Sequence, residues 1–249
     1  MSDEGWRDGT GGTAPALVEL RAVSKTYRRG PEEVHALRAV SFVLRPHEVV
    51  GLIGPSGSGK STLLNILCGW ERADGGSIGW DGDGRGVRLV DRPWQDLAVL
   101  PQRLGLIEEL TIRENIELPA RLAPGGGDTA TGPSRRQLRE RADALLVGFG
   151  LDGLAGRMPG EVSIGEQQRT AMARALLLSP KLLLADEPTG HQDEGWGRVV
   201  FRALRLAARE GTACLVATHN LEAIPFTDRV LGIRDGQVRP VQRGEVAGA

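Results

Sequence analysis

A glycine-rich turn between an apolar run and a helical pattern constrains this chain more than any other feature of its sequence. The turn reads GPSGSGKS over residues 54–61, the apolar run is Val49–Ile53, and the helical pattern covers 61–70. Glycines let successive backbone N–H groups curl around phosphate oxygens, and the start of a helix adds its positive end. The pattern therefore predicts an α/β fold in which a buried parallel strand leads into a phosphate-binding turn.

The same turn predicts which residues contact a nucleotide. Lys60 can bridge the β- and γ-phosphates, and the Ser61 hydroxyl can ligate Mg²⁺. The alternative, a chance Gly/Ser turn, does not explain the strand before it and the helix after it. The expected nucleotide-binding residues are Gly54, Pro55, Ser56, Gly57, Ser58, Gly59, Lys60, Ser61 and Thr62.

Two carboxylates follow another buried strand. The apolar run 182–185 is followed directly by Asp186 and Glu187. Unpaired charge beside a buried strand is costly, and a bound Mg²⁺ supplies a reason for it. We expect Asp186 to hold the metal through water and Glu187 to orient and deprotonate an attacking water. The alternative is a surface turn after a core strand, which the phosphate-binding turn disfavours.

Length, charge and hydropathy limit the classes of protein to consider. The 249 residues suffice for one large α/β domain, or a domain with an inserted subdomain. The formal net charge of -1 gives no overall positive field, so no nucleic-acid partner is expected. No apolar run approaches the roughly 18 residues that span a bilayer, so work at a membrane requires docking on another protein. Cys68 and Cys214 are expected to be buried and unpaired.

Periodicity and turn residues predict the remaining elements. Thr111 with Glu114, and Ser134 with Gln137, form capping boxes that start helices at 112–119 and 135–148. We therefore predict a helical subdomain at about 103–164, with flexible tails at 1–16 and 241–249. Further helices are expected near 165–178 and 195–209, and a surface loop at 121–133. Strands are expected at 17–23, 37–44, Leu97–Leu100 and 213–217, with short edge strands within 78–90 and a hairpin at 229–239.

Further motifs resemble those of ATP-binding cassette (ABC) ATPases. Residues 162–169 read VSIGEQQR, similar to the family signature, and lie about twenty residues before Asp186. Gln102 after a buried strand resembles the Q-loop, and residues 188–193 (PTGHQD) resemble the segment leading into the D-loop. His219 resembles the switch histidine, and Tyr27 the aromatic that stacks on adenine. Together with the two motifs above, these motifs occur at the family spacing and resemble the family over residues 17–240, nearly the whole chain.

The resemblance implies a RecA-like core with an antiparallel β-subdomain and the inserted helical subdomain, all within one ABC ATPase domain at 17–240. It implies binding and hydrolysis of ATP with Mg²⁺. Catalytic roles then belong to Glu187, His219 and Gln102, and the metal to Ser61, Gln102 and Asp186. Tyr27, Gln102 and His219 each have an ordinary reading as well, as strand packing, a loop glutamine and a strand-end histidine.

The resemblance also implies partners. Two chains would close head-to-tail around two ATP molecules, as a homodimer or a heterodimer, with Ser163 and Gly165 of each signature contacting the ATP of the other chain. A separate membrane permease would hold the chain, from the cytoplasm, on the inner face of the cell membrane. Residues 182–190 and 115–119 look like the branch that includes lipoprotein-release, macrolide-efflux and peptide-antibiotic export ATPases.

Alternatives and departures remain. A soluble ABC ATPase of cell division, repair or assembly, or a poorly hydrolysing nucleotide-switched binding module, would carry the same motifs. The chain lacks the second cassette of the two-cassette translation factors and the long coiled-coil insertion of the repair ATPases. Ile164 stands where the family usually has glycine, and Gln192 where it usually has an aliphatic residue. Both positions lie at the dimer interface in the family.

Overall fold

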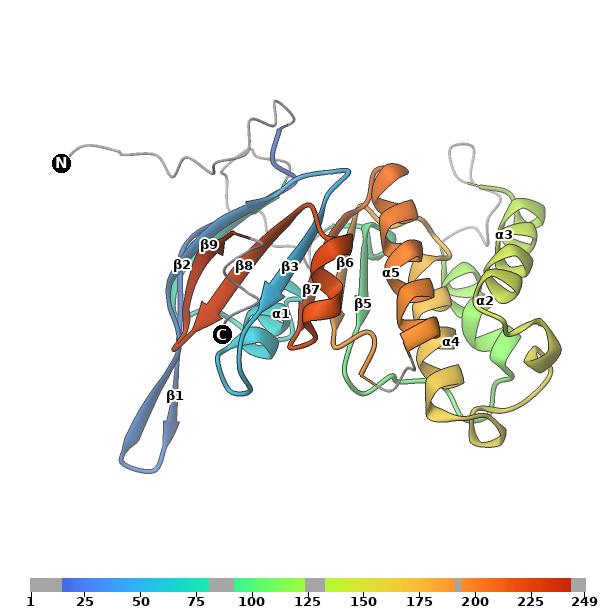
Figure 1. Cartoon of the computed structure of the whole chain (residues 1–249), viewed down its shortest axis with the longest axis horizontal. Helices are drawn as coiled ribbons and strands as arrows, with labels where there is room; N and C mark the ends of the chain where they lie inside the picture. The colour runs from blue at the N-terminus through green and yellow to red at the C-terminus, as the bar shows by residue number, and fades with distance from the viewer. Residues whose placement is uncertain (1–14, 81–91, 124–132, 191–193, 243–249) are drawn as a thin grey trace.

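The computed structural model describes residues 15–80, 92–123, 133–190 and 194–242. Figure 1 shows a twisted sheet with helices beside it and a curved antiparallel sheet at the N-terminal side. The helices are α1 (Lys60–Leu67), α2 (Ile112–Leu122), α3 (Arg135–Gly148), α4 (Ile164–Leu176) and α5 (Glu194–Arg209). The strands are β1 (Val18–Arg29), β2 (Glu32–Leu44), β3 (Val49–Ile53), β4 (Gly75–Trp80), β5 (Leu97–Leu100), β6 (Leu182–Asp186), β7 (Ala213–Thr218), β8 (Arg229–Arg234) and β9 (Gln237–Val241).

The larger sheet has the order β5-β6-β7-β3-β8-β9, and the smaller has the order β2-β1-β4. Neighbours in the larger sheet run parallel except β8 and β9, which form the predicted hairpin. The central strands β3, β6 and β7 are apolar along nearly their whole length because both faces of the sheet are covered. The predicted α/β fold with a separate antiparallel sheet is confirmed.

Two apolar cores lie on opposite faces of the larger sheet. Along β6, Leu182 and Leu184 belong to one core, and Leu183 and Ala185 to the other, as the alternation of side chains along a strand requires. The first core also contains residues of the antiparallel sheet and of α1. The second contains residues of all four helices α2–α5. Both cysteines are buried and free, as predicted.

The helical layer begins where the sequence predicted it. Both predicted capping boxes are present, at Thr111 and at Ser134, and a third that we did not predict lies at Ser163. Inside this layer Asn115 is fully buried, and its amide group bonds the backbone of Ile107, Leu110 and Thr111. The chain between β5 and α2 is thereby fixed. The division into a helical subdomain at 103–164 stays a prediction.

Several predicted boundaries differ from the structure. The strands predicted at 17–23 and 37–44 extend to a hairpin whose outer pairs include Arg28 with Glu33. Periodicity missed this part because its side chains are polar and mostly exposed, so no apolar pattern marks it. Helix α1 ends at Leu67, short of the predicted 70, and Gly69 follows with a positive φ. Most of the predicted tails, of the edge strands within 78–90 and of the loop at 121–133 lie outside the described residues.

Alanine substitutions at two glycines near the end of α3 should have opposite effects on stability. Gly150 has φ +61°, and an added Cβ would lie 2.3 Å from Cη2 of Trp196, whereas an added Cβ on Gly148 would contact nothing within 4 Å. We expect Gly150→Ala to lower the free energy of unfolding by at least about 1–2 kcal/mol, because the left-handed backbone alone costs that much. Gly148→Ala should raise it by about 0.5–1 kcal/mol, because alanine favours a helix. Urea titration of both variants measures this, and equal shifts would contradict it.

Candidate functional site

The turn between β3 and α1 is enclosed so closely that two of its positions must be glycine. An added Cβ on Gly54 would lie 2.1 Å from the carbonyl oxygen of Ile233, and one on Gly59 2.4 Å from that of Ala36. Gly59 also has φ +108°, which favours glycine, and it begins α1 without a side-chain capping bond. The first N–H groups of α1 therefore remain available to an anion.

Lys60 is the cation of this turn. Its side chain is nearly buried, at 8% exposed, and its ammonium group donates to the carbonyl oxygens of Gly54 at 2.7 Å and Pro55 at 3.1 Å. These bonds hold the positive charge inside the curve of the turn. Phosphate oxygens bound to the turn would meet it there, as the sequence predicts.

Asp186, at the end of β6, faces the start of α1. The Ser61 hydroxyl donates to its carboxylate at 2.8 Å. Burial raises the pKa of Asp186 above its ordinary value and the charge of Glu187 adds to this, while the Ser61 hydroxyl and Lys60 act in the opposite direction. A half-buried carboxylate beside a hydroxyl suits a hard cation, because Mg²⁺ takes oxygen ligands and usually only one or two carboxylates. The residues present therefore fit Mg²⁺.

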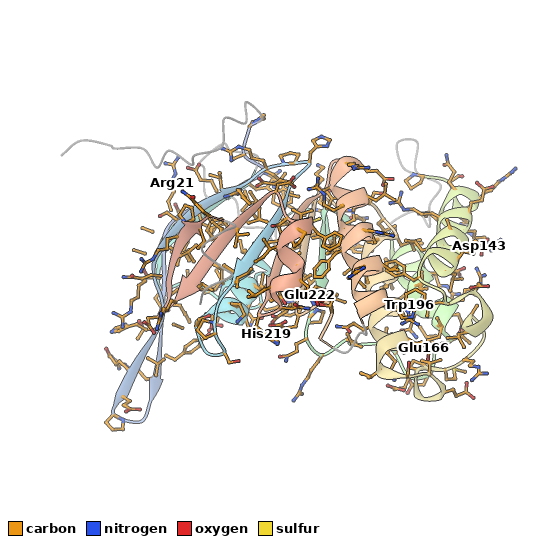
Figure 2. All side chains as sticks on the ribbon, viewed as in Figure 1. Arg21, Asp143, Glu166, Trp196, His219 and Glu222 are labelled. Atoms are coloured by element: carbon orange, nitrogen blue, oxygen red, sulfur yellow. The ribbon has the colours of Figure 1, made fainter. Side chains whose placement is uncertain are left out.

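Glu187 follows in a left-handed backbone conformation, with φ +51°. One of its carboxylate oxygens accepts from the Thr218 hydroxyl at 2.9 Å. The other accepts from the backbone N–H of His219 at 3.1 Å and lies 2.8 Å from its Nδ1, so an ionised Glu187 requires the proton on Nδ1. The His219 side chain is 71% exposed and that of Glu187 15%, so the carboxylate sits inside and the imidazole at the surface. Figure 2 shows His219 at the lower edge of the sheet.

Lys60, Ser61, Asp186 and Glu187 line one cleft of about 770 Å³. His219 reaches its edge only through Glu187, and the predicted residues Gly54, Pro55 and Ser58 are not part of the lining. Gln102 and Tyr27, predicted from motifs far apart in the sequence, line the cleft too. Tyr27 is 37% exposed, its hydroxyl donates to Glu71, and the Lys25 ammonium lies 5.5 Å from the centre of its ring, so the ring is held in place but stays partly accessible. The cleft brings together these predicted residues: Tyr27, Ser56, Gly57, Gly59, Lys60, Ser61, Thr62, Gln102, Asp186 and Glu187.

Part of the cleft wall was missed by sequence reasoning. It comes from β2 and from the turn between β8 and β9, which approach each other where the backbone N–H of Arg38 donates to the carbonyl of Gly236 at 2.8 Å. No sequence motif marks these positions, because only the fold brings them together. They are Glu32, Glu33, Val34, His35, Ala36, Arg38, Asp235 and Gly236.

The signature residues lie elsewhere. Ser163 caps α4, where its hydroxyl donates to the Glu166 carboxylate at 2.8 Å, and Ile164 is 49% exposed. Neither Ser163 nor Gly165 lines the cleft, and Figure 2 places Glu166 at the helical end of the molecule, apart from His219. Gln192 lies outside the described residues. The predicted contact of Ser163 and Gly165 with a nucleotide therefore requires a second chain.

Comparison with known proteins identifies the family. The family model "ABC transporter" matches residues 37–190. The lipoprotein-releasing system ATP-binding protein LolD of Gluconobacter oxydans is 40% identical over 242 residues, which cover 92% of this chain and 97% of that protein. The macrolide export ATP-binding/permease protein MacB of Syntrophobacter fumaroxidans is 38% identical over 90% of this chain, but only 31% of its own length is matched.

A solved structure agrees. The dimeric structure of the ATP-binding cassette MJ0796 in a post-hydrolysis state, bound to ADP and Pi, is 32% identical, with a TM-score of 0.78. The match covers 91% of this chain and 99% of that one. Within the described residues of our chain, no helix has the length and apolar character to cross a bilayer. The fold, the family and its lipoprotein-release and macrolide-export branch were predicted correctly. This chain therefore belongs to the ABC transporter family, as an ATP-binding cassette of the ATPase type that drives transport.

Proposed function

We propose that this chain binds Mg²⁺–ATP in the cleft between the glycine-rich turn and the ends of β6 and β7, hydrolyses it, and drives a separate membrane permease. The observation that carries the proposal is the fixed position of Glu187 beside Asp186. Its carboxylate is held by Thr218 and His219 at the edge of the sheet where Ser61 bonds Asp186. A base must be held in reach of its water, and three hydrogen bonds do this for Glu187.

Each group in and beside the cleft has a task. The first N–H groups of α1 and the Lys60 ammonium bind the phosphates, and Tyr27 offers its partly accessible ring to the adenine. Ser61 and Asp186, with Gln102, would hold Mg²⁺, which when bound neutralises charge on the β- and γ-phosphates. Glu187 accepts the proton of the attacking water, and His219 keeps that carboxylate oriented toward the γ-phosphate.

The active form is a pair of chains, either identical or different. Ser163 and Gly165 lie at the start of α4, away from the cleft, and the exposed first turn of that helix can approach a phosphate held by another chain. A head-to-tail pair satisfies both signatures at once. The two chains of the solved MJ0796 relative also form a dimer.

The chain works at the cytoplasmic side of a membrane, held there by the permease. Its relatives take part in lipoprotein release and macrolide export. The cleft accounts for ATP alone, so the permease selects the cargo. Co-purification from detergent-solubilised membranes tests this: a polytopic membrane protein recovered with the chain supports transport, and recovery of the chain without one favours a soluble ABC ATPase.

Lys60→Ala should weaken ATP binding as well as turnover. Lys60 contributes its charge to the phosphates in both the ground state and the transition state, so its loss raises the dissociation constant. Fluorescence titration with ATP measures the affinity. Lys181→Ala is the matched control, because Lys181 is 58% exposed and pairs with Asp96 outside the cleft. Equal affinity of the two variants would contradict the role of Lys60.

Glu187→Gln should bind ATP but lose about 10²–10⁴-fold in turnover, as expected when a general base is removed. The amide oxygen can still accept from Thr218, so the fold should be kept. Because ATP is not consumed, this variant should sediment as a dimer with Mg²⁺–ATP and as a monomer without it. More than about a tenth of wild-type turnover would show that Glu187 is not the base.

Ile164 should slow the composite site. Ile164 is the first residue of α4 and is 49% exposed, so its branched side chain can crowd a phosphate that approaches the start of the helix. A misplacement of about 1 Å can cost on the order of 10²-fold in rate. We expect Ile164→Gly to hydrolyse ATP faster at saturating ATP, in the assembled transporter or in the ATP-driven dimer.

Ile164→Ala is the matched variant, since it removes the branch and keeps a good helix former. It should also be faster, with an unchanged melting temperature. An unchanged or slower rate in both variants would show that Ile164 does not crowd the phosphate.

A further inference from the structure

A buried side chain of α4 reaches the backbone of Glu187. Gln168 is 3% exposed, and its Nε2 donates to the carbonyl oxygen of Glu187 at 2.9 Å. Gln168 lies five residues beyond Ser163, which is about 7.5 Å along a helix. The first turns of α4 therefore carry the signature at their start and, five residues later, the contact with Glu187, the proposed base.

The bond acts at a strained point. Glu187 has φ +51°, a conformation that a residue with a Cβ avoids. Its N–H donates to the carbonyl of Ala217 at 2.8 Å, and its carbonyl also accepts from the N–H of Gly190 at 3.2 Å. Gly190 belongs to the turn that follows Glu187, so it moves with that turn. Gln168 fixes the same carbonyl to a separate helix.

We propose that Gln168 is a positioning residue for Glu187, and that through this bond the signature helix sets the position of the carboxylate. The inference rests on the proposed role of Glu187 as the base. In a head-to-tail pair, the signature of one chain contacts the ATP of its partner, while Gln168 of that same chain holds the base acting on its own ATP. The two ATP sites are thus coupled within each chain by the five residues between Ser163 and Gln168.

Other contacts hold α4 in place without Gln168. Arg169 donates from Nε to the carbonyl of Phe149 at 2.9 Å, and its guanidinium carbon lies 3.9 Å from the centre of the Trp196 ring. Further along α4, Arg174 donates to the carbonyl oxygens of Gly105 at 2.7 Å and Leu104 at 2.6 Å. The fully buried Thr170, in contrast, donates within α4, to the carbonyl of Glu166 at 2.8 Å. Figure 2 shows Trp196 on α5 near the start of α4. Removing the amide of Gln168 therefore tests the bond to Glu187 while the helix stays packed.

The test is Gln168→Met in the full-length chain, because methionine keeps the length and volume of the side chain but has no donor. We expect kcat to fall by about 10-fold or more, since a small displacement of a catalytic group is costly. The KM for ATP and the ATP-driven dimerisation measured by sedimentation should stay within about twofold, because the ground-state contacts are intact.

Thr170→Val is the matched control. It removes a buried hydroxyl from the same helix at nearly constant volume, but that hydroxyl contacts only its own helix in the bond described above. Its kcat should stay within about twofold of wild type, a change too small to indicate a lost transition-state contact. Melting temperatures of both variants monitor the packing of α4. If both variants lose kcat alike, the effect belongs to the helix and the inference is wrong.

Gln168→Asn covers the case in which the methionine variant does not fold. It keeps an amide but is one methylene too short to reach Glu187, so the same loss of kcat is expected. Wild-type kcat in either folded Gln168 variant overturns the inference. The proposed function fails separately: if Glu187→Gln keeps its turnover, Glu187 is not the base, whatever the Gln168 variants do. If Glu187→Gln is inactive and Gln168→Met is fully active, only the role of Gln168 is lost.

Discussion

The parallel register of three strands is the constraint on which the site depends. Ile53 of β3 pairs with Thr218 of β7, and Asp186 of β6 pairs with Ala217 of β7. The carboxyl ends of these strands therefore meet at one edge, where the phosphate-binding turn, the two carboxylates and His219 follow them. A slip of one residue would turn every side chain of a strand to the opposite face. The two cores prevent this, because each accepts one alternate set of side chains.

This edge carries two neighbouring carboxylates and a lysine, and a bound ligand would balance the charges of both kinds of group. Asp186 and Glu187 adjoin each other, and burial together with this repulsion raises the pKa of Asp186. The Lys60 ammonium lies inside the turn, where it donates to two backbone carbonyl oxygens. A phosphate bound beside the lysine and a cation bound beside the carboxylates would neutralise each other's charge as well as the charges of these side chains. Mg²⁺ and ATP are therefore expected to bind together more tightly than either does alone.

The sequence could predict whatever depends on contiguous residues. The phosphate-binding turn, Asp186, Glu187 and two capping boxes are each local patterns, and the structure places them as expected. Features created by the fold could not be predicted. The cleft wall around Arg38 and Gly236 exists because β2 approaches the β8–β9 turn. Gln168 belongs to the signature stretch, but the sequence does not show that its side chain bonds Glu187. The roles of Ser163 and Gly165 need a second chain, so one chain cannot test them.

The stack of Arg169 on Trp196 gives the molecule a built-in optical probe. The indole lies where α4 meets α5, with the guanidinium carbon 3.9 Å from the ring centre. The emission of an indole responds to a nearby cation, so its colour and intensity report whether the two helices remain in contact. Five tryptophans occur in the chain, and subtracting the spectrum of a Trp196→Phe protein isolates this one. Stopped-flow fluorescence can then time the movement of the signature helix during a single turnover, with no attached dye.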